Sequence, residues 1–187
     1  MNRMAIQRNV GCFLFLLSVS LLVGCSSANK PTDKNFIKAL NAYYENHYDC
    51  LFPHGKVFPY EVGPGSNSKQ DRKQMDALTD AGLLTRKNDP TVHVERYSLN
   101  AVGQRYAPKF CYGRREVTSI VSFTPPGPRH GFTETTVTYH YTMLYVSEWA
   151  KSDSMKAAFP DLAKSLGTSL SGQATLATAG AGWQVTE

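Results

Sequence analysis

Apolar residues between positions 33 and 48 recur at steps of one, three and four, the spacing that places side chains on one face of a helix. The stripe consists of Phe36, Ile37, Leu40, Tyr43, Tyr44 and His47. Lys34 and Glu45 fall on the opposite side, so the pattern predicts an amphipathic helix over residues 33–48. Asp33 is suited to be its N-cap. Because His47 continues the stripe, we interpret it as a core or boundary residue rather than a ligand.

Beyond residue 116 the pattern changes to an alternation of apolar and polar residues, which indicates strands with one buried face. Residues 117–124 and 132–149 show it on either side of a proline-rich loop at 125–131. The two strands should pair as a hairpin with an exposed tip. In the longer strand one face consists of Val137, Tyr139 and Tyr141, and the other of Thr136, Thr138, His140 and Thr142.

Two further elements follow this hairpin. Residues 152–166 predict a helix that is broken and restarted at Pro160, because proline suits the first turn of a helix. Phe159 and Leu162 would then dock on the sheet. Residues 174–185 have the pattern of a closing hairpin around a glycine-rich turn.

A second helical pattern covers residues 68–81 and ends at Gly82, a residue favoured after helix C-termini. Leu83 and Leu84 then lead, through a polar turn, to a strand-like run that closes on Tyr97-Ser98-Leu99-Asn100-x-x-Gly103. This order of helix, Gly-Leu-Leu, hairpin and closing motif resembles winged-helix domains, with Asn100 where their pattern commonly has threonine. The resemblance implies a winged-helix-like shape for this part of the chain.

Taken together, the patterns predict an α+β protein. A helical, winged-helix-like part over residues 33–108 would pack with an antiparallel sheet that carries one helix over residues 109–187. Turn-forming glycines and prolines dominate residues 51–66, between the first two helices. The length is enough for one domain or two small ones.

The first 24 residues lie outside these predicted elements and have the parts of an export signal. Arg3 and Arg8 give a positive start, and the apolar run over residues 12–23 is shorter than the about 20 residues of a membrane span. The run ends in Leu22-Val23-Gly24-Cys25, followed by Ser26, which resembles the lipobox of bacterial lipoprotein precursors. An uncleaved anchor helix or a buried N-terminal helix is the alternative.

In lipoprotein precursors the cysteine thiol receives diacylglycerol, the signal peptide is cut before the cysteine, and the new amine is acylated. Carried over, residues 1–24 are the signal peptide, and Cys25 becomes the first mature residue and the membrane anchor. Residues 25–32 would form a short tether. In enteric bacteria an aspartate after the cysteine tends to retain such proteins in the inner membrane, so Ser26 favours the periplasmic face of the outer membrane.

The net charge of the chain gives little information about its partners once residues 1–24 are left out of the count. The full chain has 20 Lys and Arg against 15 Asp and Glu, and removal of Arg3 and Arg8 leaves 18 against 15, a formal charge of +3. The second helix lacks the dense basic face that neutralisation of phosphates requires, and an envelope protein meets no genomic DNA. We therefore expect no nucleic-acid partner.

Cys50 and Cys111 are the cysteines that remain after Cys12 leaves with the signal and Cys25 takes lipid. An even pair in an oxidising compartment favours a disulfide, which would close a loop of about 60 residues. A metal site made by Cys50, His54 and Cys111 is the alternative, although no metal-ligand spacing supports it.

No nucleophile elbow, zinc-binding helix motif, Walker loop or dinucleotide-binding glycine pattern occurs in the sequence, so we expect no cofactor and no bound metal. The leading hypothesis is a non-catalytic lipoprotein that binds an envelope protein or a small molecule. The candidate residues lie on the hairpin, whose exposed tip suits contacts: Arg129, His130, Thr136, Thr138, His140 and Thr142. The alternatives are a merely solvated sheet face, and an envelope hydrolase or inhibitor whose site is assembled only in space.

Overall fold

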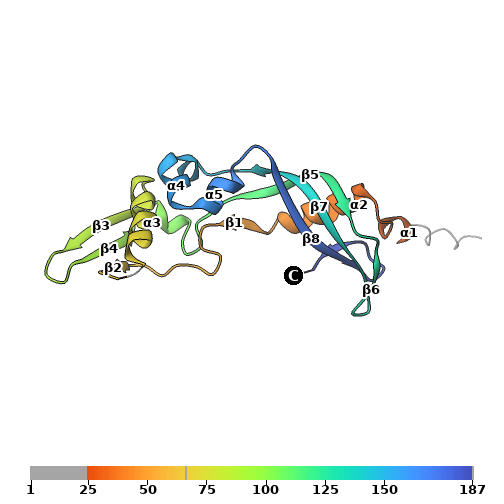
Figure 1. Ribbon diagram of the computed structural model, residues 1–187, viewed down its shortest axis with the longest axis horizontal. Helices are drawn as coiled ribbons and strands as arrows, with labels where there is room; N and C mark the ends of the chain where they lie inside the picture. Colours follow the sequence, from red (N-terminus) through yellow and green to blue (C-terminus); the bar gives the residue numbers. More distant parts are fainter. Residues whose placement is uncertain (1–24, 66, 187) are drawn as a thin grey trace, which may run out of the picture.

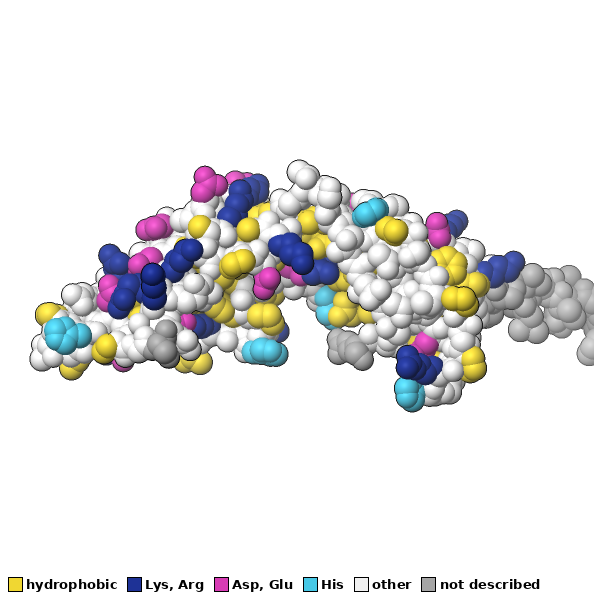
Figure 2. Space-filling view, viewed as in Figure 1, with side chains coloured by type: hydrophobic (Ala, Val, Ile, Leu, Met, Phe, Trp, Pro, Cys, Tyr) yellow, Lys and Arg dark blue, Asp and Glu magenta, His cyan; other side chains and the backbone are white. Residues whose placement is uncertain are grey.

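Within residues 25–65 and 67–186, which the computed structural model describes, the chain folds into two antiparallel sheets. The sheets lie end to end in an elongated, arched molecule (Figures 1 and 2). Helices pack on both of them, so the α+β prediction is confirmed. The predicted signal peptide, residues 1–24, lies outside the described residues.

The larger sheet consists of β1 Tyr48–Cys50, β5 Cys111–Phe123, β6 Gly127–Arg129, β7 Phe132–Leu144, β8 Leu170–Thr178 and β9 Gln184–Val185. The strand order is β1-β5-β7-β8-β9, and the short β6 pairs with β7. β5 and β7 pair antiparallel almost throughout their length, which confirms the predicted hairpin. β8 and β9 form the predicted closing hairpin.

One face of this sheet is covered by the helix α2, Asp33–Tyr44. Phe36 and Leu40 of α2 are fully buried among side chains that point inward from β5, β7 and β8, such as Val137 and Leu176. Figure 1 shows the helix running beside the strands at the end of the molecule where the described chain begins. The N-terminal helix and the C-terminal sheet therefore share one hydrophobic core.

Both ends of α2 differ from the prediction. Thr32, rather than Asp33, is the N-cap, and its hydroxyl accepts a hydrogen bond from the amide of Asn35. The helix ends at Tyr44 because the chain turns there into β1. His47 consequently lies exposed, outside the core, with its ring stacked on that of Tyr43 at a centroid distance of 3.7 Å.

The smaller sheet consists of β2 Tyr60–Val62, β3 Leu84–Asp89 and β4 Val94–Leu99, in the order β2-β4-β3. The helix α3, Ser68–Asp80, packs beside it. Gly82 follows with a φ of 73°, the left-handed conformation expected after a helix C-terminus. The predicted helix, glycine and hairpin are therefore present. The strand β2 was not predicted, because glycines and prolines dominate residues 51–66.

The winged-helix detail of the prediction is not supported, because the helices of this part do not pack with one another. α2 lies on the larger sheet, and the helix that packs against α3 is α4, Asp153–Ala158, from the C-terminal half. The chain restarts as α5, Pro160–Ser165, as predicted from Pro160. The remaining short helices are α1 Cys25–Ala28, η1 Gly103–Arg105 and η2 Glu148–Lys151.

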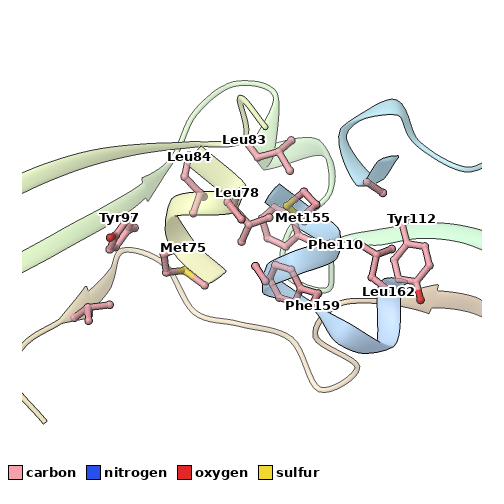
Figure 3. Close-up of a cluster of buried hydrophobic side chains, with 14 residues drawn as sticks. Met75, Leu78, Leu83, Leu84, Tyr97, Phe110, Tyr112, Met155, Phe159 and Leu162 are labelled. Atoms are coloured by element: carbon pink, nitrogen blue, oxygen red, sulfur yellow. The ribbon is translucent and has the colours of Figure 1, made fainter. Parts of the chain in front are cut away.

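The core cluster beside the smaller sheet also draws on both halves of the chain (Figure 3). Met75 of α3 and Met155 of α4 are buried in it, as is Phe110, which precedes β5. Phe159 and Leu162, expected on the larger sheet, are buried here. Three aromatic rings lie around Phe110 at centroid distances of 5.8 to 6.4 Å: Phe52, Phe58 and Trp149.

Cys50 and Cys111 form the predicted disulfide, between the neighbouring strands β1 and β5. The bond occupies both sulfurs, which excludes the alternative metal site with His54. β5 begins at Cys111, earlier than the alternation predicted, because Cys111, Gly113 and Arg114 pair with β1. The disulfide therefore links the short edge strand β1 covalently to β5, its neighbour in the larger sheet.

Candidate binding surfaces

The solvent-facing side of β7 is the surface on which the sequence pattern predicts binding residues. Val137 and Tyr139 point inward and are fully buried, as the alternation predicts. The candidate residues Thr136, Thr138, His140 and Thr142 point to the other side. His140 and Thr142 are exposed, while the two preceding threonines are half-buried.

Short polar side chains extend this face across the neighbouring strands. Ser119 of β5 and Ser171 of β8 lie on either side of His140 in the strand register. The amide of Gln173 donates a hydrogen bond of 3.4 Å to the hydroxyl of Thr138. A sheet face of hydroxyl, amide and imidazole groups suits contact with another polar surface.

Arg129 and His130 lie apart from that face, at the tip of the β6–β7 hairpin. Thr142 is ten residues further along β7 than Phe132, which corresponds to about 33 Å of extended strand. At the tip, Nδ1 of His130 lies 3.8 Å from the carboxylate of Glu134. The six candidate residues are therefore spread along β7 and the hairpin tip that precedes it, and they are not brought together into one site.

A half-buried ion pair, which the sequence analysis missed, lies between β1 and β5. The guanidinium of Arg115 donates two hydrogen bonds, of 2.8 and 2.9 Å, to the carboxylate of Asp49. It also lies over the ring of Tyr141, 4.9 Å from the centroid. Burial opposes the charge of Arg115, but the hydrogen bonds to Asp49 outweigh this effect and raise its pKa. The pair therefore ties the edge strand β1 to its neighbour β5.

The hydroxyl groups of Tyr44 and Tyr139 form a buried hydrogen bond of 2.5 Å between α2 and β7. Burial, followed by this hydrogen bond, raises the pKa of Tyr139, so its hydroxyl stays protonated. Tyr139→Phe should lower the free energy of unfolding by about 1–2 kcal/mol, because Tyr44 loses its partner. Urea unfolding measures the change, with Tyr145→Phe on an exposed tyrosine as the control, expected to stay within about 0.5 kcal/mol. Equal losses in the two variants would contradict the prediction.

A second charged network joins α3 to the smaller sheet. The hydroxyl of Tyr97 and the guanidinium of Arg86 both donate to Asp76, at 2.9 and 2.8 Å. Arg72 pairs with Glu95 beside them. Burial, followed by the bond to Asp76, raises the pKa of Tyr97. Because these groups bind one another, the network is suited to fixing the β3–β4 hairpin on α3 rather than to acid–base chemistry.

Hollows lie at the end of the molecule where the described chain begins. A groove of about 450 Å³ runs between α2, at Ala39 and Tyr43, and the C-terminal residues 181–185. A second hollow of about 560 Å³ separates the hairpin tip, at Pro128 and Phe132, from the turn after β8. Both volumes fall within the range of about 300–1,000 Å³ that is common for small-molecule sites.

Asn29 fastens this end of the chain to the turn between β8 and β9. Its side-chain amide forms three hydrogen bonds of 2.8 to 3.1 Å, with Thr178, Gly180 and Gly182. The indole of Trp183 donates to the carbonyl of Lys30 at 3.2 Å. The segment expected to be a tether, residues 25–32, thus contains α1 and is bonded to the fold. Sequence reasoning missed these contacts because their partners lie at opposite ends of the chain.

No protein family, curated protein or solved structure matches the chain. Among residues 25–65 and 67–186, no group of His, Cys, Asp and Glu side chains is placed to hold a metal ion. In the same described part, no helix has the length and apolar character needed to cross a membrane. The class of protein is therefore inferred from its sequence motifs and from the geometry above.

Proposed function

We propose that the chain is a lipoprotein of the bacterial cell envelope, lipidated at Cys25, with its folded part on the periplasmic face of the outer membrane. The observation that carries this proposal is the lipobox-like run Leu22-Val23-Gly24-Cys25, whose cysteine is the first residue of α1. The Cys50–Cys111 disulfide supports it, because such bonds persist in oxidising compartments. Ser26 favours the outer membrane over the inner one.

The folded part serves as a non-catalytic binding or structural module for an envelope protein or a small molecule. In support, the Arg115–Asp49 pair and the network around Asp76 consist of charged groups that bind one another. The outer face of β7, with its threonines and His140, offers hydroxyl and imidazole groups to a polar protein surface. The groove beside Tyr43 offers an apolar lining to a small molecule.

The intact mass of the protein purified from membranes tests the proposal. We expect a chain that begins at Cys25 and carries acyl chains, in which Cys50 and Cys111 react with a thiol reagent only after reduction. Cys25→Ala should accumulate as an unlipidated precursor, whereas Cys12→Ala, within the signal peptide, should leave the mature mass unchanged. An unlipidated chain that retains Met1 and has both thiols free would overturn the proposal.

A further inference from the structure

We propose that the tip of the β6–β7 hairpin, residues 127–132, is a second membrane contact, which rests on the headgroups of the bilayer that holds Cys25. The inference deepens the proposed function and rests on it, because the lipid on Cys25 brings the bilayer to this end of the molecule. The partner is a lipid surface with anionic headgroups, recognised by an exposed arginine and an exposed phenylalanine.

The tip lies close to the lipidated residue. Asn29 follows Cys25 by four residues, about 6 Å of helix, and it lines the same hollow as Pro128, Gly131 and Phe132. Figure 1 shows α1 and β6 at one end of the molecule and the β3–β4 hairpin at the other. A bilayer that holds Cys25 therefore passes within reach of the β6–β7 tip and far from the β3–β4 tip.

The connection between the anchor and the fold is short and firmly bonded. Asn29 is held by the turn after β8, as described above, and the side-chain amide of Asn35 donates to the carbonyls of Ser27 and Lys30, at 2.9 Å each. Ser27, the first of these fixed points, follows Cys25 by only two residues. The fold therefore has little freedom to turn its hairpin tip away from the membrane surface.

The tip is a tight turn that fixes two side chains next to each other. His130 and Gly131 both have positive φ, 51° and 82°, as in the two-residue type I′ turns that join antiparallel strands. Arg129 and Phe132 are directly opposite each other in the strand register, so their side chains leave the hairpin on the same side. Phe132 is 48 % exposed, and the combination of phenylalanine with basic residues also occurs in helices that lie at membrane interfaces.

The charge around this end of the molecule favours an anionic surface. Arg129 is exposed at the tip, and Lys30 and Lys34 are exposed beside α1. These three basic residues outnumber the acids nearby, Asp33 and Glu134. Figure 2 shows basic and histidine side chains, with an acidic one beside them, at the tip at the lower right. Each basic residue near an anionic leaflet adds attraction that falls off within a Debye length.

Hydrogen exchange of the lipidated protein tests the contact. The protein is measured on vesicles of phosphatidylcholine with phosphatidylglycerol, on vesicles of phosphatidylcholine alone, and in detergent micelles. We expect the amides of residues 129–133 to exchange about fivefold more slowly on the anionic vesicles than in micelles, with a smaller effect on neutral vesicles. The β3–β4 tip is the matched control, because Val92 is exposed there and His93 also has a positive φ, and its exchange should not change.

Two variants test the roles of the side chains. Arg129→Gln should reduce the difference between anionic and neutral vesicles, and Phe132→Ser should remove the protection on both. Equal exchange at the tip on vesicles and in micelles would overturn the contact, as would protection that persists in Phe132→Ser.

Flotation and intact mass of the same samples separate the two proposals. A lipidated protein that floats with vesicles but has an unprotected tip overturns the membrane contact alone. An unlipidated protein that does not float overturns the proposed function and the contact that rests on it.

Discussion

Loss of the Cys50–Cys111 bond is expected to lower the free energy of unfolding by about 4 kcal/mol. The bond joins residues 61 positions apart, and without it the unfolded chain regains the conformational freedom of that loop. For a domain of this size the change corresponds to a fall in melting temperature of about 10 °C. Cys50→Ala combined with Cys111→Ala removes the bond without leaving a free thiol.

Urea unfolding of the parent protein and of this double variant, with and without reductant, measures the effect. Reductant should destabilise the parent protein and leave the double variant unchanged. That comparison separates the effect of the disulfide on stability from the effect of replacing the two cysteine side chains. Equal unfolding midpoints for the oxidised and reduced parent protein would refute the prediction.

Phe110→Ala should lower the free energy of unfolding by about 4 kcal/mol as well, because it opens a cavity in the cluster that joins the two halves of the chain. Phe110 is fully buried, and it is surrounded by the rings of Phe52, Phe58 and Trp149. These rings come from segments far apart in the sequence and cannot collapse onto the space without moving the strands between them.

The matched control for Phe110→Ala is Phe132→Ala, which removes the same atoms from an exposed position. In detergent solution this variant should stay within about 0.5 kcal/mol of the parent protein. The measurement is chemical unfolding followed by circular dichroism. A loss at Phe110 no greater than that at Phe132 would show that the cluster is not the shared core described here.

Local patterns predicted the elements that depend on neighbouring residues. The alternation around Tyr139 fixed which side of β7 is buried, and Gly82 marked the end of α3, because both signals arise from the backbone geometry of a single element. The same kind of reasoning failed at His47. Its place in the apolar stripe could not reveal that the helix ends at Tyr44, where pairing of β1 with β5 takes over.

The packing partners of each helix could not be predicted in this way. α2 resembles any amphipathic helix, and nothing in its pattern indicates that its partner is a sheet from the other half of the chain. The contacts beside the hollow at the hairpin tip show the same limit. Asn29 and Gly180 are hydrogen-bonded although they are 151 residues apart in the sequence. The winged-helix resemblance rested on element order, which the structure keeps, while the contacts between helices differ.

The packing of α2 on the C-terminal sheet bears on how the chain would fold if it is exported as proposed above. Phe36 of α2 packs edge-to-face on Trp183, with centroids 5.2 Å apart, so α2 gains this partner only when the residues directly before the last strand have been made. In the lipoprotein proposed above, a chain held at Cys25 would therefore complete this core only after its C-terminus has crossed the membrane. Completion of this core would then follow translocation, and a chain truncated before Trp183 would leave the apolar side of α2 partly uncovered.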